Sequence, residues 1–189
     1  MEPLLRTVAI VGAGFSGTLV ATRLLRGSLQ GPTRILLIER SGTFARGVAY
    51  AAREHPYLLN VPAARMSASG EDPLQFLKFA QRRDPSTSGE DFLPRTLYGE
   101  YLTELLLAAE LAAPRHLRLE RVHADVQAVE RPSRTAPLQL KLANGDRIVA
   151  DDVVLATGNP PPAPLAVMAA VARCAPRLRI SPGNTSAMR

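Results

Sequence analysis

The stretch "TVAIVGAGFSG", residues 7–17, decides the fold. It begins with a short apolar run, Val8 to Val11, whose β-branched residues are typical of a strand buried on both faces. Gly12, Gly14 and Gly17 follow with the G-x-G-x-x-G spacing of a dinucleotide-binding turn. In such a turn the first glycine permits the tight bend and the second lets a pyrophosphate approach the backbone. The third lets the following helix pack closely on the strand.

The residues after the glycines complete this motif. Apolar residues recur at helical spacing from Phe15 to about Arg26, and "RILLIER" (34–40) is a second buried strand. Glu39 stands at its end, 22 residues after Gly17, where a carboxylate can accept hydrogen bonds from both ribose hydroxyls of an adenosine and repel a 2′-phosphate. The pattern predicts dinucleotide binding, with NADP disfavoured at this site. The alternative is a glycine turn in another α/β fold, with Glu39 merely solvated. The candidate contacts here are Gly12, Gly14, Phe15, Ser16, Gly17, Glu39 and Arg40.

The segment after the second strand is expected to carry two helices. Residues 41–71 are irregular and rich in Gly, Ala and Pro, which is typical of a functional loop. Asp72 and Pro73 form a helix start, with an N-cap followed by proline at the first helical position. A second helix is expected from about Leu97 to Ala113.

Strands dominate the remainder of the sequence. The "NGD" at 144–146 is a strong hairpin turn, and "DDVVLATG" (151–158) has the pattern of a buried strand that ends in a glycine turn. The expected fold class is α/β, a Rossmann-like parallel sheet with a β-meander on one side. Further strands are expected at 117–122, 125–131 and 138–143.

Composition excludes several classes of function. The net charge of +6 invites a nucleic-acid interpretation, but the basic residues are scattered, nearly all are arginine, and no recognition module accompanies them. The sequence therefore indicates neither a nucleic-acid partner nor a membrane span, because no apolar run is long enough for the latter. The three histidines lie far apart, which disfavours a metal site. The single cysteine, Cys174, and the immediate first strand fit a cytoplasmic protein without a signal peptide.

The later segments distinguish FAD from NAD. A long insertion after Glu39, then a meander, then "VVLATG", resembles the FAD domain of two-dinucleotide flavoproteins of the glutathione-reductase and flavin-monooxygenase type. In that resemblance the "ATG" strand end, Thr157 and Gly158, lies against FAD, and the chain then crosses to a domain that binds NAD(P)H.

The insertion narrows the resemblance further. "GVAYAAREHPYLLNVPAARMSA" and "DFLPRTLYGEYL" are similar to a family of bacterial FAD/NAD(P)-binding proteins that includes FAD-dependent urate hydroxylase and is distantly related to lysine and ornithine N-hydroxylases. The similarity covers about residues 5–162. It implies that Arg46, Tyr50, Asn60 and Met66 shape the flavin side of the site, and that Val126 offers its backbone to the adenine. Each has a simpler alternative as a solvated loop, turn or core residue.

Three functions remain open at this stage. The chain is a FAD-binding domain of a flavin-dependent monooxygenase, a single-domain NAD-binding protein, or a non-catalytic interaction module. We expect a FAD domain at residues 1–160, with a helical insertion at 41–114, and a short, partly disordered tail at 161–189. A second glycine motif is absent, so NAD(P)H would act as reductant only if a second domain were supplied. The apolar face left without that domain would favour a homodimer.

Overall fold

The computed structural model describes residues 5–27, 29–51 and 57–158. Its centre is a four-stranded parallel sheet in the order β3-β2-β1-β7. These strands are β1 (Arg6–Val11), β2 (Thr33–Glu39), β3 (Leu117–His123) and β7 (Asp152–Leu155). Because the strands are parallel, the carboxyl ends of β1, β2 and β7 meet at one edge, where Val11 is in register with both Ile38 and Leu155. The expected α/β fold class is confirmed.

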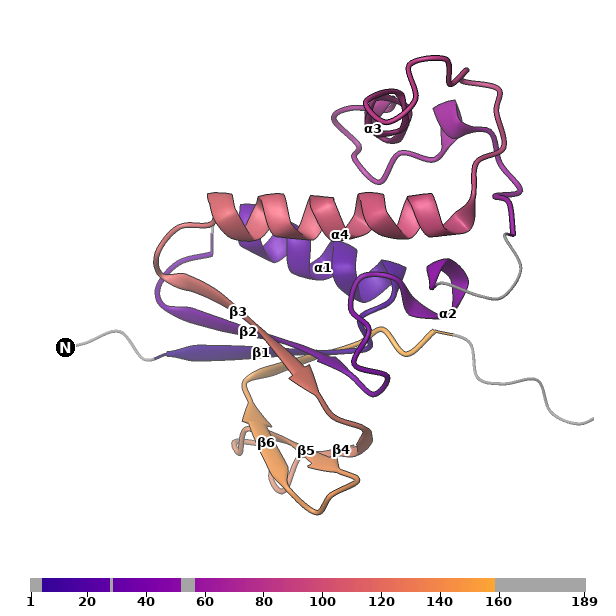
Figure 1. Cartoon of the computed structure of the whole chain (residues 1–189). Helices are drawn as coiled ribbons and strands as arrows, with labels where there is room; N and C mark the ends of the chain where they lie inside the picture. Colours follow the sequence, from indigo (N-terminus) through magenta and orange to yellow (C-terminus); the bar gives the residue numbers. More distant parts are fainter. Residues whose placement is uncertain (1–4, 28, 52–56, 159–189) are drawn as a thin grey trace, which may run out of the picture. The chain divides into compact units, whose positions relative to one another are not determined.

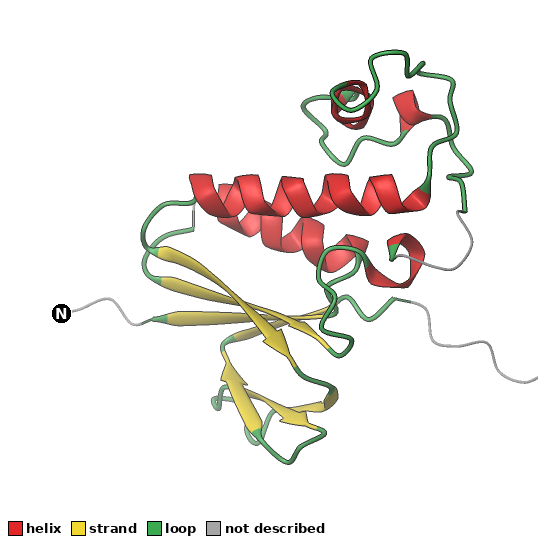
Figure 2. Ribbon diagram, in the orientation of Figure 1, coloured by secondary structure: helices red, strands yellow, loops and turns green. Residues whose placement is uncertain are grey.

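The alternation of side chains along the central strands builds a separate core on each face of the sheet. Ile10, Ile35 and Leu37 join the core beneath α1 (Phe15–Arg26) and α4 (Arg95–Ala112), which lie together on one face (Figure 1). Ala9, Leu36 and Ile38 pack on the opposite face against Leu140 and Ala150 of the meander. That meander is an antiparallel sheet of β4 (Val126–Glu130), β5 (Leu138–Leu142) and β6 (Arg147–Ala150), seen below the parallel sheet in Figure 2.

The segment between β2 and β3 contains more helical elements than the sequence predicted. Besides α4 it holds α2 (Gly47–Tyr50), a 3₁₀ turn at Ala63–Arg65 and α3 (Gln75–Gln81). The predicted start of α3 at Asp72 and Pro73 is wrong by two residues. The Asp72 carboxylate accepts a hydrogen bond from the Leu74 N–H at 3.2 Å, but this closes a turn ahead of the helix.

The surroundings of two strands were clear only from the pairing of the sheet. β3 joins the parallel sheet beside β2, with Leu37 in register with Arg121, rather than the meander that follows it. β7 was expected to be buried, but its residues are half-buried and Leu155 is 66% exposed. The reason is its place at the edge of the sheet, where β1 is its one neighbouring strand among the described residues.

No helix in the described part of the chain is long and apolar enough to cross a membrane. The predicted tail, residues 161–189, lies outside the described residues.

Candidate functional site

Gly12 makes the turn from β1 to α1, and its conformation admits no side chain. Its φ is +100°, a left-handed value that side chains rarely adopt. A Cβ at this position would lie 2.3 Å from the Ala156 carbonyl oxygen. The Gly12 N–H donates to the Ile38 carbonyl at 2.8 Å, and the Ala156 N–H donates to the Val11 carbonyl at the same distance. The turn is therefore fixed between the ends of β2 and β7.

The other two glycines differ in what surrounds them. A Cβ at Gly17 would lie 1.9 Å from the Gly12 carbonyl oxygen, so glycine is needed there for α1 to rest on the turn. A Cβ at Gly14 would meet only the Gly47 Cα, at 3.7 Å, which is an ordinary contact. Two of the glycines are thus required by packing within the protein, whereas packing leaves room for a side chain at Gly14.

The start of α1 presents backbone donors. Gly14 is the N-cap and supplies no side-chain cap, and the first turn contains no acidic residue. The first N–H groups of a helix have no partner within the helix and carry a partial positive charge. Phe15 and Ser16 are exposed in this first turn, so an anion can reach these groups from solvent.

The Glu39 carboxylate lies directly against this turn. Its Oε2 accepts a hydrogen bond from the Ala13 N–H at 2.9 Å, and its Oε1 accepts from the Ser41 N–H and hydroxyl, both at 3.0 Å. Partial burial raises the pKa of Glu39, but the hydrogen bonds from Ala13 and Ser41 outweigh it and hold the pKa below the usual value. The carboxylate is therefore ionised at neutral pH and held at the mouth of the turn.

The link from β3 to β4 lies beside Glu39. The Ala124 N–H donates to the Glu39 carbonyl at 3.3 Å, and Val126 begins β4 two residues later, at a bulge in the pairing with β5. His123 shares a hydrogen bond of 3.1 Å with the carbonyl of Arg40, whose own side chain is exposed. Of the predicted adenosine contacts, the fold thus places Glu39, Arg40 and Val126 on neighbouring strand ends.

α2 brings two further predicted residues next to the glycine turn. A Cβ at Gly47 would lie 2.8 Å from the Gly14 Cα, so the first residue of α2 lies against the turn. Arg46 precedes it as the N-cap of α2, and the Tyr50 ring packs 4.8 Å from Tyr98 and 6.4 Å from Phe15, centroid to centroid. Arg46 and Tyr50 were expected in an irregular segment, whereas Arg46 is the N-cap of α2 and Tyr50 is its last residue, so this helix was not predicted.

The remaining predicted residues are less closely joined to the turn. Thr157 and Gly158 are exposed and follow Ala156, whose carbonyl lies against Gly12. Asn60 is exposed, whereas Met66 is half-buried and packs against the helical core. In the described part of the chain, no hydrogen bond joins either Asn60 or Met66 to the glycine turn.

Several residues that shape the site were missed from the sequence. Ser41 holds the Glu39 carboxylate, Gly47 admits close contact with Gly14, and Ala45 is buried with a φ of +68°. Gly99 in α4 leaves room for α2, because a Cβ there would lie 2.6 Å from the Tyr50 carbonyl oxygen. The glycines at 47 and 99 were the available signal, but their contacts come from residues distant in sequence.

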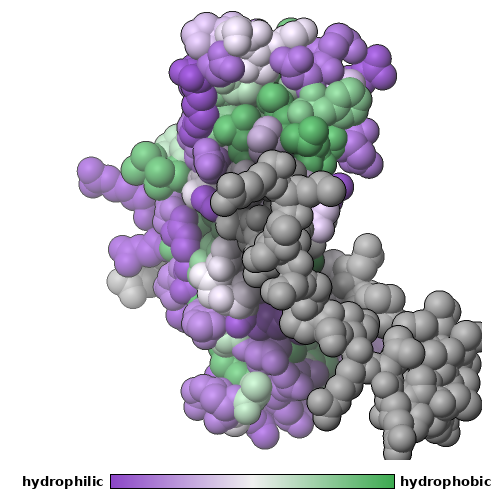
Figure 3. Space-filling view, turned by 45° about the vertical axis from the view of Figure 1, so that its right-hand side comes forward, coloured by the Kyte–Doolittle hydropathy of each residue, from purple (hydrophilic) through white to green (hydrophobic). Residues whose placement is uncertain are grey.

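Several large apolar side chains in the described part of the chain are exposed. Val48 is 77% exposed, and Leu58, Phe92 and Leu155 are each at least half exposed. Figure 3 shows hydrophobic surface in the upper half of that view, bordered by hydrophilic surface. Among the described residues, no group of His, Cys, Asp and Glu is arranged to hold a metal ion.

Comparison with known proteins gives a family and a fold. A family model described as FAD-NAD(P)-binding matches residues 9–160. A flavin-containing monooxygenase from Stenotrophomonas maltophilia is 24% identical with a TM-score of 0.53, covering 83% of this chain and 39% of its own. Cyclohexanone monooxygenase from Rhodococcus sp. Phi1, bound to NADP⁺, is 18% identical with a TM-score of 0.54, covering 83% of this chain and 26% of its own.

A third structure is that of a bacillithiol disulfide reductase from Staphylococcus aureus, 16% identical with a TM-score of 0.53, covering 84% of this chain and 39% of its own. The chain thus spans between a quarter and two-fifths of the length of these proteins. No curated protein matches. At these identities the likeness establishes the fold.

Proposed function

The chain belongs to the FAD-NAD(P)-binding family, and from this premise we propose that it is the FAD-binding domain of a flavin-dependent oxidoreductase. The observation that carries the proposal is the Glu39 carboxylate, held 2.9 Å from the Ala13 N–H at the start of α1. An ionised carboxylate and a free helix N-terminus side by side suit an adenosine ribose and the pyrophosphate next to it.

The fit of a dinucleotide to these residues rests on their unused hydrogen-bonding capacity. A carboxylate has about four acceptor positions, and the protein occupies three of those on Glu39, which leaves acceptor capacity for a ribose hydroxyl. At Gly14 the backbone is unobstructed except for the contact with Gly47, so a phosphate can approach the first turn of α1. The negative charge of Glu39 opposes a 2′-phosphate, which favours FAD or NAD over NADP at this position.

We assign the cofactor contacts to the elements that converge on the turn. Gly12, Gly14, Phe15, Ser16 and Gly17 would face the pyrophosphate, Glu39 and Arg40 the ribose, and the Val126 backbone the adenine. The flavin end would lie toward Arg46, Tyr50, Asn60 and Met66 on one side and Thr157 and Gly158 on the other. FAD supplies the redox chemistry when bound, and the chain's own residues bind and orient it.

The finer assignment is a monooxygenase. It is supported by the motifs of the insertion, which resemble those of FAD-dependent urate hydroxylase, and by a fold shared with flavin monooxygenases. In such an enzyme NAD(P)H would reduce the flavin from a second dinucleotide domain, and this chain would act together with that domain. Val48, Leu58 and Leu155 are exposed apolar residues that such a domain, or a second copy of the chain, would cover.

The test is to purify the full chain, record its visible spectrum, and titrate the cofactor-free protein separately with FAD, NAD⁺ and NADP⁺. The expected result is saturable FAD binding, with NADP⁺ binding much more weakly. A Glu39→Gln variant tests the role of the carboxylate. Glu130→Gln in β4 is its matched control, because the Glu130 side chain is exposed and bonds only Lys141 in the described structure. Binding of NAD⁺ without FAD would replace the proposal with a single-domain NAD-binding protein. Binding of none of the three would leave a non-catalytic interaction module.

A further inference from the structure

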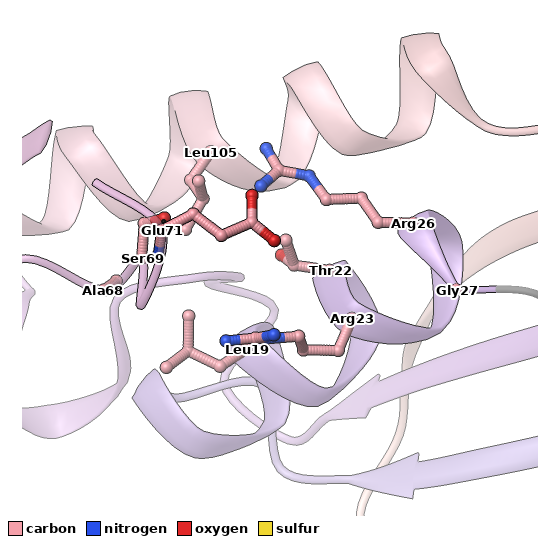
Figure 4. A pocket seen from close by; sticks show the side chains of 9 residues that line it. All are labelled: Leu19, Thr22, Arg23, Arg26, Gly27, Ala68, Ser69, Glu71 and Leu105. Atoms are coloured by element: carbon pink, nitrogen blue, oxygen red, sulfur yellow. Dashed lines mark hydrogen bonds between the residues drawn. The ribbon is translucent and has the colours of Figure 1, made fainter.

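A cavity lies at the C-terminal end of α1, away from the glycine turn. Its volume is about 170 Å³, and it is formed by the last turns of α1, the loop at 68–71 and one residue of α4 (Figure 4). An apolar cavity of about 150 Å³ holds a benzene molecule, so this space suits a ligand of about six non-hydrogen atoms. The lining residues are Leu19, Thr22, Arg23, Arg26, Gly27, Ala68, Ser69, Glu71 and Leu105.

Thr22 contributes to the wall of this cavity, but its hydroxyl lies behind that wall. Thr22 is only 3% exposed, and its Oγ1 has almost no accessible surface and no hydrogen-bond partner among the described residues. A ligand in the cavity would therefore contact the charged and apolar side chains of the lining rather than this hydroxyl.

Charged groups of both signs face the same space. Figure 4 shows the guanidinium groups of Arg23 and Arg26 and the carboxylate of Glu71 around the cavity. The Arg23 Nη2 lies 3.8 Å from where a Cβ on Gly70 would stand, so this guanidinium rests over the loop. All three charged side chains belong to exposed residues and are reachable from solvent, whereas Leu105 forms a buried apolar wall.

We propose that this cavity binds a small carboxylate that carries a hydrogen-bond donor on the neighbouring carbon, the class of α-amino and α-hydroxy acids. The arginines offer forked N–H donors that match a carboxylate. Glu71 accepts from the ligand's ammonium or hydroxyl. Leu19, Ala68 and Leu105 contact a short aliphatic side chain. A simple anion fits less well, because Glu71 repels it and gains no donor.

The test is calorimetric titration of the full chain, without added FAD, with glycolate, acetate, ethylene glycol and inorganic phosphate. These probes separate the two halves of the recognition, since acetate lacks the donor and ethylene glycol lacks the carboxylate. Glycolate is expected to bind at least about tenfold more tightly than acetate or phosphate, because it alone pairs with both Arg26 and Glu71. Ethylene glycol is expected not to bind.

Variants assign the binding to the cavity. Arg26→Gln and Glu71→Gln should each weaken glycolate by about tenfold, the scale of one hydrogen bond to a charged group. Arg118→Gln, which removes the same charge from an exposed position on β3, should leave the affinity unchanged.

Two outcomes overturn the proposal. One is equal binding of acetate, phosphate and glycolate, which would mean that any anion collects at the arginines. The other is binding of none of them at millimolar concentration, which would leave the cavity to water. Because neither result depends on FAD, a failure here is distinct from a failure of the proposed function.

Discussion

Replacing Gly14 separates cofactor binding from folding more cleanly than any other change in the glycine turn. Its φ of −74° and ψ of −161° suit any residue, and an added Cβ would make only one ordinary contact, 3.7 Å from the Gly47 Cα. Gly14→Ala gains about 0.4–1 kcal/mol by restricting the unfolded chain. It loses about the same amount because alanine is a poor N-cap. The free energy of unfolding should therefore change by less than about 1 kcal/mol, a shift of at most about 2–4 °C in Tm.

The effect on FAD should be much larger. The methyl group would stand where the pyrophosphate approaches the backbone, and losing one charge-assisted hydrogen bond costs about 1.5–3 kcal/mol. FAD affinity should fall about ten- to a hundredfold or more. The assay is FAD titration followed by flavin fluorescence, with thermal unfolding of the same cofactor-free samples. Gly70→Ala is the matched control, since a Cβ added at Gly70 would have the Arg23 Nη2 as its nearest neighbour, at 3.8 Å. An affinity within twofold of the parent, with Tm unchanged, would refute the placement of the pyrophosphate at Gly14.

Three other changes give distinct outcomes. Gly17→Ala places a Cβ 1.9 Å from the Gly12 carbonyl oxygen, so unfolding should show a loss of about 3 kcal/mol or more; a stable variant would mean that α1 can lift from the turn. Glu39→Gln should weaken FAD by about 1–3 kcal/mol at pH 7, and unchanged affinity would make Glu39 a structural residue only. Because the pKa of Glu39 is lowered in the folded protein, its contribution to stability is complete above its usual pKa of 4.5 and is lost as the pH falls through the folded value. The stability difference between parent and Glu39→Gln should therefore shrink in acid unfolding experiments, and a difference constant from pH 7 to pH 3 would contradict the assigned hydrogen bonds. Gly99→Ala should push α2 away from α4, because its Cβ would lie 2.6 Å from the Tyr50 carbonyl oxygen, and should lower the free energy of unfolding by about 1–3 kcal/mol. FAD titration of this variant tests whether α2 shapes the site. An unaltered unfolding curve would argue against this packing.

The sequence was most informative where the chain is locally organised. The strand at Val8–Val11, the helix at Phe15–Arg26 and the strand ending at Glu39 were each predicted within a residue or two of their bounds. Their apolar periods and glycine spacing depend only on neighbouring residues. The position of Glu39 beside the turn also follows from the motif, since parallel strands bring their carboxyl ends to one edge.

Elsewhere the local signal was too weak. The α2 helix is only four residues long, and its place against Gly14 depends on two glycines, Gly47 and Gly99, that are 52 residues apart. The start of α3 was misplaced because Asp72 and Pro73 are equally suited to a turn. The apolar periodicity of residues 41–81 indicates neither the short α2 helix nor the true start of α3.

The sequence by itself determined the strand–turn–helix–strand unit, the acid at its end and hence the class of nucleotide that the chain is built to bind. The tertiary structure decided what fixes that unit: Ala156, more than a hundred residues later in the chain, closes on Gly12, and Ser41 and Ala13 orient Glu39. It also placed β7 at an exposed edge and left the buried Thr22 hydroxyl of α1 without a hydrogen-bond partner among the described residues. The difference reflects separation along the chain. Sequence motifs encode contacts between near neighbours, whereas the packing of distant segments is settled only when the whole core forms.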